Sequence, residues 1–266
     1  MIPSISCISS DQIRHITGVF FDIDDTFSSS GKILPSAYTA LWQLKHAGLK
    51  VVPITGRPAG WCDHIARMWP VDAVVGENGA FYFRVDEQKG RFVKRFVDDD
   101  ITRIEKRKRL IDIGAEVLNN VPGTALASDQ NYREADLAID FCEDVPRLGW
   151  DDIDRICAIF GKYGATYKVS SIHVNGWFGD YSKLDMTRVL AHELWNMELE
   201  KEKDRFVYFG DSPNDEPMFR FFPFSIGVKN VLNFTDRMRF LPAFVTTYEG
   251  GEGFAEAVRM ILEKRG

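Results

Sequence analysis

The sequence predicts an α/β fold in which a doubly wound, Rossmann-like parallel sheet carries an inserted α+β domain. Short apolar runs alternate with amphipathic segments in the first 80 residues. From about residue 81, apolar and polar residues alternate with a period of two, which is typical of antiparallel hairpins. Alternating strands and helices then return. We therefore expect a core formed by residues 1–80 and 180–266, interrupted by a second domain over residues 81–179.

In the first part of the core we expect three buried strands separated by two helices. The strands are predicted at 19–21, 49–54 and 71–75, and the helices at 35–48 and 58–69. Each apolar run is short enough for a strand that is buried on both faces. Pro35 suits the first turn of a helix, and Pro70 stops the second one. The buried side of that second helix is expected to hold Trp61, Ile65 and Met68.

The inserted domain is predicted to combine hairpins and helices. The expected elements are a hairpin (81–85, 91–97), a helix (99–119), a strand (137–141), a helix (151–163) and a second hairpin (166–170, 172–178). The buried stripe of the first helix is predicted to be Ile101, Ile104, Ile111, Ala115 and Leu118, because they recur at helical spacing. The core then resumes with a helix from Lys183 to Met197, strands at 206–209, 224–228 and 244–247, and a helix at 253–264.

Composition excludes several classes of protein. The chain has 266 residues and a net charge of −6, so it lacks the basic balance of a general nucleic-acid binder. No apolar run is long enough to span a membrane, and residues 1–7 do not resemble a signal peptide. Four scattered cysteines without a Cys-x-x-Cys pair indicate reduced thiols. We expect a cytoplasmic protein, monomeric or a small homo-oligomer, that acts on a small molecule.

The most informative segment follows the first predicted strand. There Asp22 and Asp24 are separated by one residue, and Thr26 comes two positions later. Directly after a buried strand, this spacing places two carboxylates in one small volume. Carboxylates packed so closely repel each other, so they need a cation or a shared proton. The same residues would also suit a polar turn that caps the next helix.

Three further motifs follow in order along the chain. They are Thr55-Gly56-Arg57, Lys183, and Gly210-Asp211-Ser212-Pro213-Asn214-Asp215. Thr55 and the Gly56 amide lie where a strand meets a helix, which suits phosphate binding. Carboxylate oxygens such as those of Asp211 and Asp215 are hard ligands suited to Mg²⁺. Each motif alone also fits an ordinary turn or a surface charge, but together they predict one site.

The four motifs resemble those of the haloacid dehalogenase superfamily of phosphotransferases. The segment Gly-Asp-Ser-x-Asn-Asp-x-Pro-Met is very similar to the fourth motif of that family. An insertion between the second and third motifs, together with Glu77-Asn78-Gly79-Ala80, resembles the subgroup with a type II cap, which includes Cof-type and sugar-phosphate phosphatases. The chain departs from the family in having Lys183-Leu184 where such members often have Lys-Gly.

The resemblance implies a role for each motif residue. Asp22 would be the nucleophile and Asp24 the general acid and base. Thr55, Gly56, Arg57, Lys183 and Asn214 would bind the phosphoryl group. Asp22, the backbone carbonyl of Asp24, and Asp211 would bind Mg²⁺, with Asp215 completing the first or second shell.

The resemblance also implies that the inserted domain selects the substrate. Arg133, His173 and Asn175 are its candidate substrate contacts, although a polar sheet face would explain His173 and Asn175 as well. We expect a Mg²⁺-dependent phosphatase that acts on a small phosphorylated metabolite, a sugar phosphate, through an aspartyl-phosphate. The alternatives are a phosphomutase resembling phosphomannomutase, which would use the same residues, and a catalytically silent binding protein.

Overall fold

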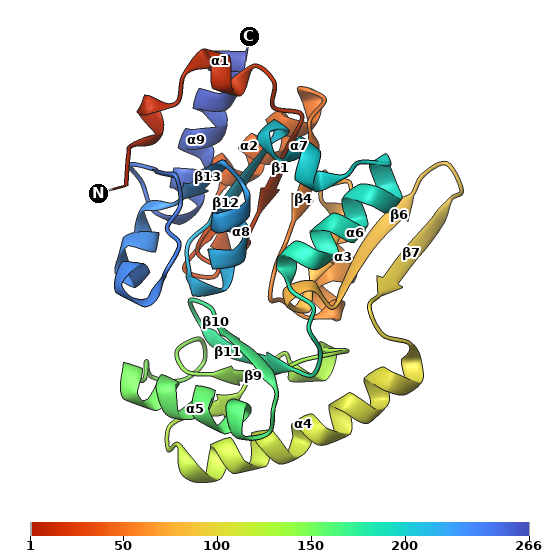
Figure 1. Ribbon diagram of the computed structural model, residues 1–266, viewed down its shortest axis with the longest axis vertical. Helices are drawn as coiled ribbons and strands as arrows, with labels where there is room; N and C mark the ends of the chain where they lie inside the picture. Colours follow the sequence, from red (N-terminus) through yellow and green to blue (C-terminus); the bar gives the residue numbers. More distant parts are fainter. Residues whose placement is uncertain (1, 266) are drawn as a thin grey trace.

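The computed structural model describes residues 2–265, and its centre is a five-stranded parallel sheet (Figure 1). The strand order is β14-β13-β12-β1-β4. The bounds are β1 (Gly18–Phe21), β4 (Lys50–Pro53), β12 (Phe206–Gly210), β13 (Phe224–Gly227) and β14 (Phe244–Val245). In the central register Phe21 lies beside Phe209 on one side and Pro53 on the other. The predicted parallel sheet is confirmed.

Helices cover both faces of this sheet because its strands are apolar on both sides. Phe21 packs on one face against α2 (Pro35–His46) and α9 (Gly250–Arg265). Phe20 packs on the other face against α6 (Lys183–Trp195) and α8 (Glu216–Phe221). The result is the doubly wound arrangement that the sequence predicts.

The first predicted hairpin extends the core. Strand β5 (Val74–Gly76) touches β4 through a bridge between Ile54 and Val75, and it pairs antiparallel with β6. The hairpin consists of β6 (Phe81–Asp86) and β7 (Arg91–Phe96). Phe81 and Phe83 pack against α3 (Ala59–Met68) of the core. The hairpin therefore belongs structurally with β5, and the separate α+β body begins after it.

That second body is a four-stranded antiparallel sheet covered by two helices. Its strand order is β10-β11-β9-β8, with bounds β8 (Ala125–Leu126), β9 (Leu137–Asp140), β10 (Thr166–Val169) and β11 (His173–Trp177). Helices α4 (Asp100–Asn120) and α5 (Trp150–Lys162) cover the face that points away from the core (Figure 1). The opposite face therefore points toward the ends of the core strands.

Helix α4 buries a different face from the one that its sequence predicts. Ile101 and Ile111 are 72% and 69% exposed, whereas Ile113 is fully buried. The buried face contains Gly114, whose missing side chain lets the helix approach Leu126 and Leu137 closely. The predicted stripe was wrong because α4 has two apolar stripes, and the one with the small residue packs more tightly.

The predicted face of α3 was also partly wrong. Ile65 is buried, but Met68 is 65% exposed. Cys62 and Ala66 fill the core side instead, because small side chains fit between α3 and β5. Trp61 is half-exposed and its ring lies under the Arg57 guanidinium, 4.5 Å from it.

Two chain connections run side by side where the core meets the second body. Gly79 has a φ of 108°, a conformation that L side chains rarely adopt. A Cβ at this position would collide with the backbone of Ser182, on the returning connection. Glycine therefore allows the turn between β5 and β6 to touch the segment that returns from the second body to α6.

Several short elements were not predicted. They are β8, α8, α1 (Ser10–Ile13), α7 (Leu199–Glu202), and a small hairpin of β2 (Ser28–Ser29) and β3 (Lys32–Ile33). All four cysteines are free thiols. Within residues 2–265, none of the helices has the length and apolar character needed to cross a membrane.

Candidate active site

Two predicted carboxylates meet at the carboxyl ends of neighbouring strands. Asp22 directly follows β1 and Asp211 directly follows β12, and these strands are parallel partners. The Asp22 N–H donates to the Phe209 carbonyl at 2.9 Å, which extends the ladder by one residue. Both side chains are buried. This edge is where open α/β sheets place ligands.

Lys183 joins the site from the start of α6, after the chain has passed through the second body. Its Nζ lies 2.7 Å from Asp22 Oδ1 and 2.7 Å from Asp215 Oδ1. Burial alone would lower the pKa of Lys183, but the charges of Asp215 and Asp22 outweigh it and raise that pKa. The lysine is therefore a fixed cation beside the candidate nucleophile.

Asp215 is bound by four donors. Its Oδ1 accepts hydrogen bonds from Lys183 Nζ at 2.7 Å and from the Tyr208 hydroxyl at 2.5 Å. Its Oδ2 accepts from the backbone N–H groups of Asp211 and Ser212 at 2.9 and 3.3 Å. Because both oxygens are occupied, this carboxylate holds the Asp211 loop and Lys183 in place.

The donor set fits a divalent cation. Asp22, Asp211 and Asp215 each offer an oxygen, and these oxygens lie within 4.8 Å of one another. Burial and the charges of Asp215 and Asp22 raise the pKa of Asp211 well above its usual range. Burial raises the pKa of Asp22 to about 8, despite Lys183. One ammonium does not balance three buried carboxylates, and hard oxygen ligands with unbalanced charge suit Mg²⁺.

The second motif supplies a hydroxyl and a guanidinium. The Thr55 hydroxyl accepts from the Arg57 N–H at 3.0 Å, which tightens the turn after β4. The Arg57 guanidinium then reaches Asp24, with Nη2 at 2.8 Å from Oδ1 and Nε at 3.0 Å from Oδ2. Paired contacts of this kind fix both groups. The Asp24 carboxylate is therefore bound to Arg57, and it is not one of the three carboxylates that could share a metal ion.

Two acidic residues of the second body also bind Arg57. Glu143, just after β9, approaches Arg57 Nη2 at 2.5 Å, and Asp129 approaches Nη1 at 3.3 Å. Glu143 also lies 2.9 Å from Nε2 of His173. Sequence reasoning missed both acids, because a charged residue in a loop gives no signal of what it faces.

Of the three predicted substrate contacts, only His173 and Asn175 reach the site cavity. They project from the same face of β11 and line the cavity with Asp22 and Asp24. Asn175 Nδ2 donates to Asp136 at 2.9 Å. Asn214 lines the same cavity.

Arg133 does not line the cavity, which corrects the expectation that it grips substrate. It is fully buried behind the Thr55-Gly56-Arg57 turn. Its Nη1 donates to the Gly56 carbonyl and to Asp136, each at 2.9 Å, and its Nη2 donates to Asp129 at 3.0 Å. Through these hydrogen bonds Arg133 connects the second body to the Thr55-Gly56-Arg57 turn.

Glu77 is a second connection that the sequence did not reveal. Its buried carboxylate accepts the backbone N–H of Ala59 at the start of α3 at 2.9 Å. It also accepts N–H groups from Glu134, Ala135 and Asp136, at 2.6 to 3.1 Å. In the sequence, the Glu77-Asn78-Gly79-Ala80 segment resembles the subgroup with a type II cap, but that resemblance did not assign a role to Glu77.

The cavity above Asp22 is nearly closed. Its volume is about 10 Å³. That is about the room one water molecule needs, so a phosphoryl group does not fit beside the present side chains.

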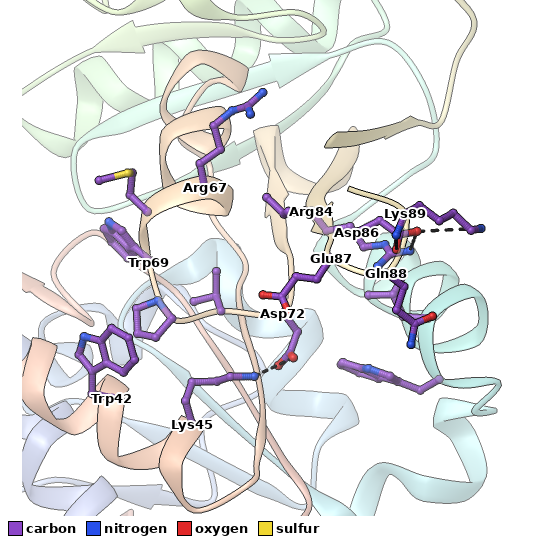
Figure 2. A pocket seen from close by; sticks show the side chains of 16 residues that line it. Trp42, Lys45, Arg67, Trp69, Asp72, Arg84, Asp86, Glu87, Gln88 and Lys89 are labelled. Carbon is purple, nitrogen blue, oxygen red and sulfur yellow. Dashed lines mark hydrogen bonds and ion pairs between the residues drawn. The ribbon is translucent and has the colours of Figure 1, made fainter. Parts of the chain in front are cut away.

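A much larger cavity, of about 770 Å³, lies away from the four motifs (Figure 2). Figure 2 shows Trp42 and Trp69 on one side of it and the turn with Glu87 on the other. Several of its charged groups are paired with each other, as in the 2.7 Å contact between Lys45 and Asp72 and the 2.9 Å contact between Arg84 and Asp86. None of the motif residues lines it.

Comparison with known proteins supports the class of protein that the fold and site define. Residues 19–118 match the haloacid dehalogenase-like hydrolase family. No curated protein sequence is significantly similar to this chain.

Several solved structures share the fold over nearly their whole length. A Thermoplasma acidophilum protein is 20% identical, with a TM-score of 0.68 over 93% of this chain and 98% of its own. The sucrose-phosphatase of Synechocystis is 14% identical, with a TM-score of 0.63 over 92% and 98%. A haloacid dehalogenase-like hydrolase of Bacteroides thetaiotaomicron is 15% identical, with a TM-score of 0.61 over 92% and 99%.

At such low identities these structures establish the fold, and the predicted fold is confirmed. The family match covers residues 19–118 and agrees with the resemblance that the four motifs show.

Proposed function

We propose that this enzyme is a Mg²⁺-dependent phosphatase that hydrolyses a small phosphorylated metabolite, a sugar phosphate, through an aspartyl-phosphate on Asp22. The observation that carries the proposal is the buried contact of 2.7 Å between Asp22 and Lys183, beside Asp211. This arrangement gives a nucleophile, a cation for phosphoryl oxygens and a candidate metal ligand in one place.

In the proposed first step, Asp22 attacks phosphorus and the ester oxygen leaves. Lys183 reduces the repulsion between the Asp22 carboxylate and the incoming phosphate. Thr55, the Gly56 amide and Asn214 would bind the phosphoryl oxygens. When bound, Mg²⁺ would neutralise charge on those oxygens and orient them for in-line displacement. Asp22 and Asp211 would hold it, with the Asp24 carbonyl, and Asp215 would support them.

Asp24 would protonate the leaving oxygen and then deprotonate the attacking water. In this structure its carboxylate accepts hydrogen bonds from the Arg57 guanidinium. We propose that the substrate phosphate binds the Arg57 guanidinium in place of Asp24. The Asp24 carboxyl group is then free to act as the general acid and base. The pairing would then keep the empty enzyme inactive.

We propose that residues 100–179 act as the cap that selects the substrate. The core motifs meet the phosphoryl group, which all substrates share, so discrimination must come from other contacts. His173 and Asn175 face the site from the second body, and Glu143 closes over Arg57. Polar and acidic groups of this kind suit the hydroxyls of a sugar, and the neighbour from Synechocystis is a sucrose-phosphatase. Four free thiols fit the reducing cytoplasm that we propose as its location.

The metal requirement tests this proposal. Treatment with EDTA should remove activity toward p-nitrophenyl phosphate, and Mg²⁺ should restore it, with Ca²⁺ a poor substitute because of its larger and looser shell. Asp211→Ala should weaken Mg²⁺ binding measured by calorimetry, whereas Asp112→Ala, on the exposed surface of α4, should leave it unchanged. Full activity after exhaustive chelation contradicts the proposal.

The nature of the products separates hydrolysis from the alternatives. A phosphatase releases inorganic phosphate from a panel of sugar phosphates, whereas a phosphomutase returns the phosphoryl group to the sugar. A silent binding protein does neither. Release of inorganic phosphate in step with loss of the ester supports hydrolysis, and an isomeric sugar phosphate as the product supports the phosphomutase.

A further inference from the structure

A strongly basic groove lies next to the candidate site. It has a volume of about 570 Å³ and runs between β10, α8 and the loop at residue 239. Its charged lining residues are Lys168, Arg188, Lys203, Arg220, Arg239 and a single acid, Glu216. The whole chain has a net charge of −6, so this local excess of cations is not a consequence of composition.

Most of these cations lack a carboxylate partner. Arg188 is paired, with Asp185 at 3.0 Å and Glu200 at 2.6 Å. Within residues 2–265, no ion pair is formed by Lys168, Lys203, Arg220 or Arg239. Cations gathered in a concave surface create a positive potential that attracts anions.

Aromatic rings hold part of this charge in position. The Lys203 ammonium lies 5.4 Å from the ring centre of Phe221, and the Arg220 guanidinium lies 4.7 Å from that of Phe240. Such contacts restrict the rotamers of long side chains before any ligand arrives. The groove is therefore partly organised for an anion.

A second cavity connects the groove to the candidate active site. It has a volume of about 300 Å³ and shares Lys168 and Pro217 with the groove. At its other end it contains Lys183 and Asn214, which belong to the proposed phosphate site. One molecule can therefore extend from Lys183, past Lys168, into the basic groove.

The connecting cavity also has unused donors. Asn78 and Trp177 are 2% and 1% exposed, and both line it. Asn78 Nδ2 and Trp177 Nε1 have no hydrogen-bond partner among the described residues. Buried donors without partners are costly, and a ligand with hydroxyl or other acceptor oxygens would satisfy them.

We propose that the groove binds a second anionic group, a phosphate or a carboxylate, of the substrate whose scissile phosphate lies over Asp22. This inference rests on the proposed function and narrows its substrate class to phosphate esters with two anionic ends. The hydroxylated middle of such a molecule occupies the connecting cavity, beside Asn78 and Trp177. Lys168 lies at the junction and contacts the second anion together with Arg220 and Arg239.

Equilibrium binding tests the groove without relying on turnover. Glucose 6-phosphate, 6-phosphogluconate and glucose 1,6-bisphosphate share a six-carbon sugar skeleton and differ in the second anion. We expect the two-anion ligands to bind about 10- to 100-fold more tightly, as one or two charged hydrogen bonds would give. Calorimetry on Asp22→Asn protein with Mg²⁺ present measures each Kd. If glucose 1,6-bisphosphate has the lower Kd, the groove prefers phosphate, and if 6-phosphogluconate has the lower Kd, it prefers carboxylate.

Two matched double variants test whether the groove causes the preference. Arg220→Gln/Arg239→Gln should remove most of it. Arg91→Gln/Arg259→Gln changes the net charge equally at exposed positions outside the groove and should keep it. Equal Kd values for one-anion and two-anion ligands overturn the proposal, and so does the same loss in both double variants. A two-anion preference in a protein without phosphatase activity rejects the proposed function but keeps the groove.

Discussion

At the scale of single residues, the site is organised by charges that bind each other across the core and the second body. Arg57 contacts Asp24 of the core and Glu143 of the second body, while Arg133 contacts Gly56 and Asp136. The Arg133–Asp136 pair is fully buried, so removing one partner there leaves an uncompensated charge, whereas Glu143 is partly exposed. The role of each of these arginines therefore depends on the groups that surround its guanidinium.

Arg133→Ala should lower stability and activity together. Its loss leaves the buried Asp136 without its cation and leaves Asp129 with only the 3.3 Å contact to Arg57, and breaking a buried pair typically costs on the order of 3–5 kcal/mol. Because the arginine supports the Gly56 turn, kcat/KM should fall to the same extent for p-nitrophenyl phosphate and for larger esters. Thermal unfolding and kinetics on both kinds of substrate measure this.

The control for that variant is Arg107→Ala. Arg107 is half-exposed and 3.7 Å from Glu134, so its loss should change stability by less than about 0.5 kcal/mol. If Arg133→Ala instead impaired only the larger esters, the arginine would be a substrate contact and the structural role would be wrong.

At the scale of elements, the second body depends on which face of α4 packs. Ile113 and Val117 are fully buried against β9 and α5, and Gly114 allows the close approach. Ile104 and Ile111 lie on the opposite face of α4 and are exposed to solvent. The position of the small sheet over the core strands follows from this packing.

A pair of isoleucine variants measures which face is buried. Ile113→Ala should cost about 2–5 kcal/mol, because it removes buried methyl groups and leaves a cavity. Ile111→Ala, at 69% exposure, should change the free energy of unfolding by less than about 0.5 kcal/mol. Chemical denaturation of both variants gives the two values. Similar losses in the two would mean that α4 packs by the other stripe.

At the scale of the whole molecule, the structure is a closed state held by contacts between its two bodies. Glu77 accepts backbone N–H groups from both of them. Glu143 binds Arg57 from the far side, and the cavity beneath holds about 10 Å³. For the proposed phosphate ester to lie over Asp22, the side chains that line this small cavity have to move apart.

The Glu143 contact should make stability depend on pH. Burial alone would raise the pKa of Glu143, but hydrogen bonds from His173 and Arg57 and their charges lower it to about 2 from 4.5. A lowered carboxyl pKa stabilises the folded state above the ordinary pKa, and this stabilisation is lost as pH falls. The difference in Tm between wild type and Glu143→Gln should be constant above about pH 4.5 and shrink toward pH 2. A difference that grows on acidification contradicts this.

The sequence predicted those features that local patterns determine. The parallel strands follow from short apolar runs, and Asp22 and Asp211 are brought together because they end neighbouring strands. The face of α4 was not predictable, because the choice between two stripes depends on Gly114 meeting Leu137 from a distant strand. Glu77 and Glu143 were missed for the same reason, since their partners are far along the chain. Arg133 was predicted to contact the substrate because the sequence does not show that its side chain is buried.

The central claim is that Asp22 is the nucleophile, and the activity of Asp22→Asn tests it most directly. An amide cannot form the acyl-phosphate, so hydrolysis of p-nitrophenyl phosphate with Mg²⁺ should fall by at least about 10³-fold. The Tm should stay near or above that of wild type, because a buried carboxylate is neutralised. Asp112→Asn, on the exposed surface of α4, is the control and should keep full activity. If a folded Asp22→Asn enzyme retained a few per cent of wild-type turnover, a different residue would have to be the nucleophile.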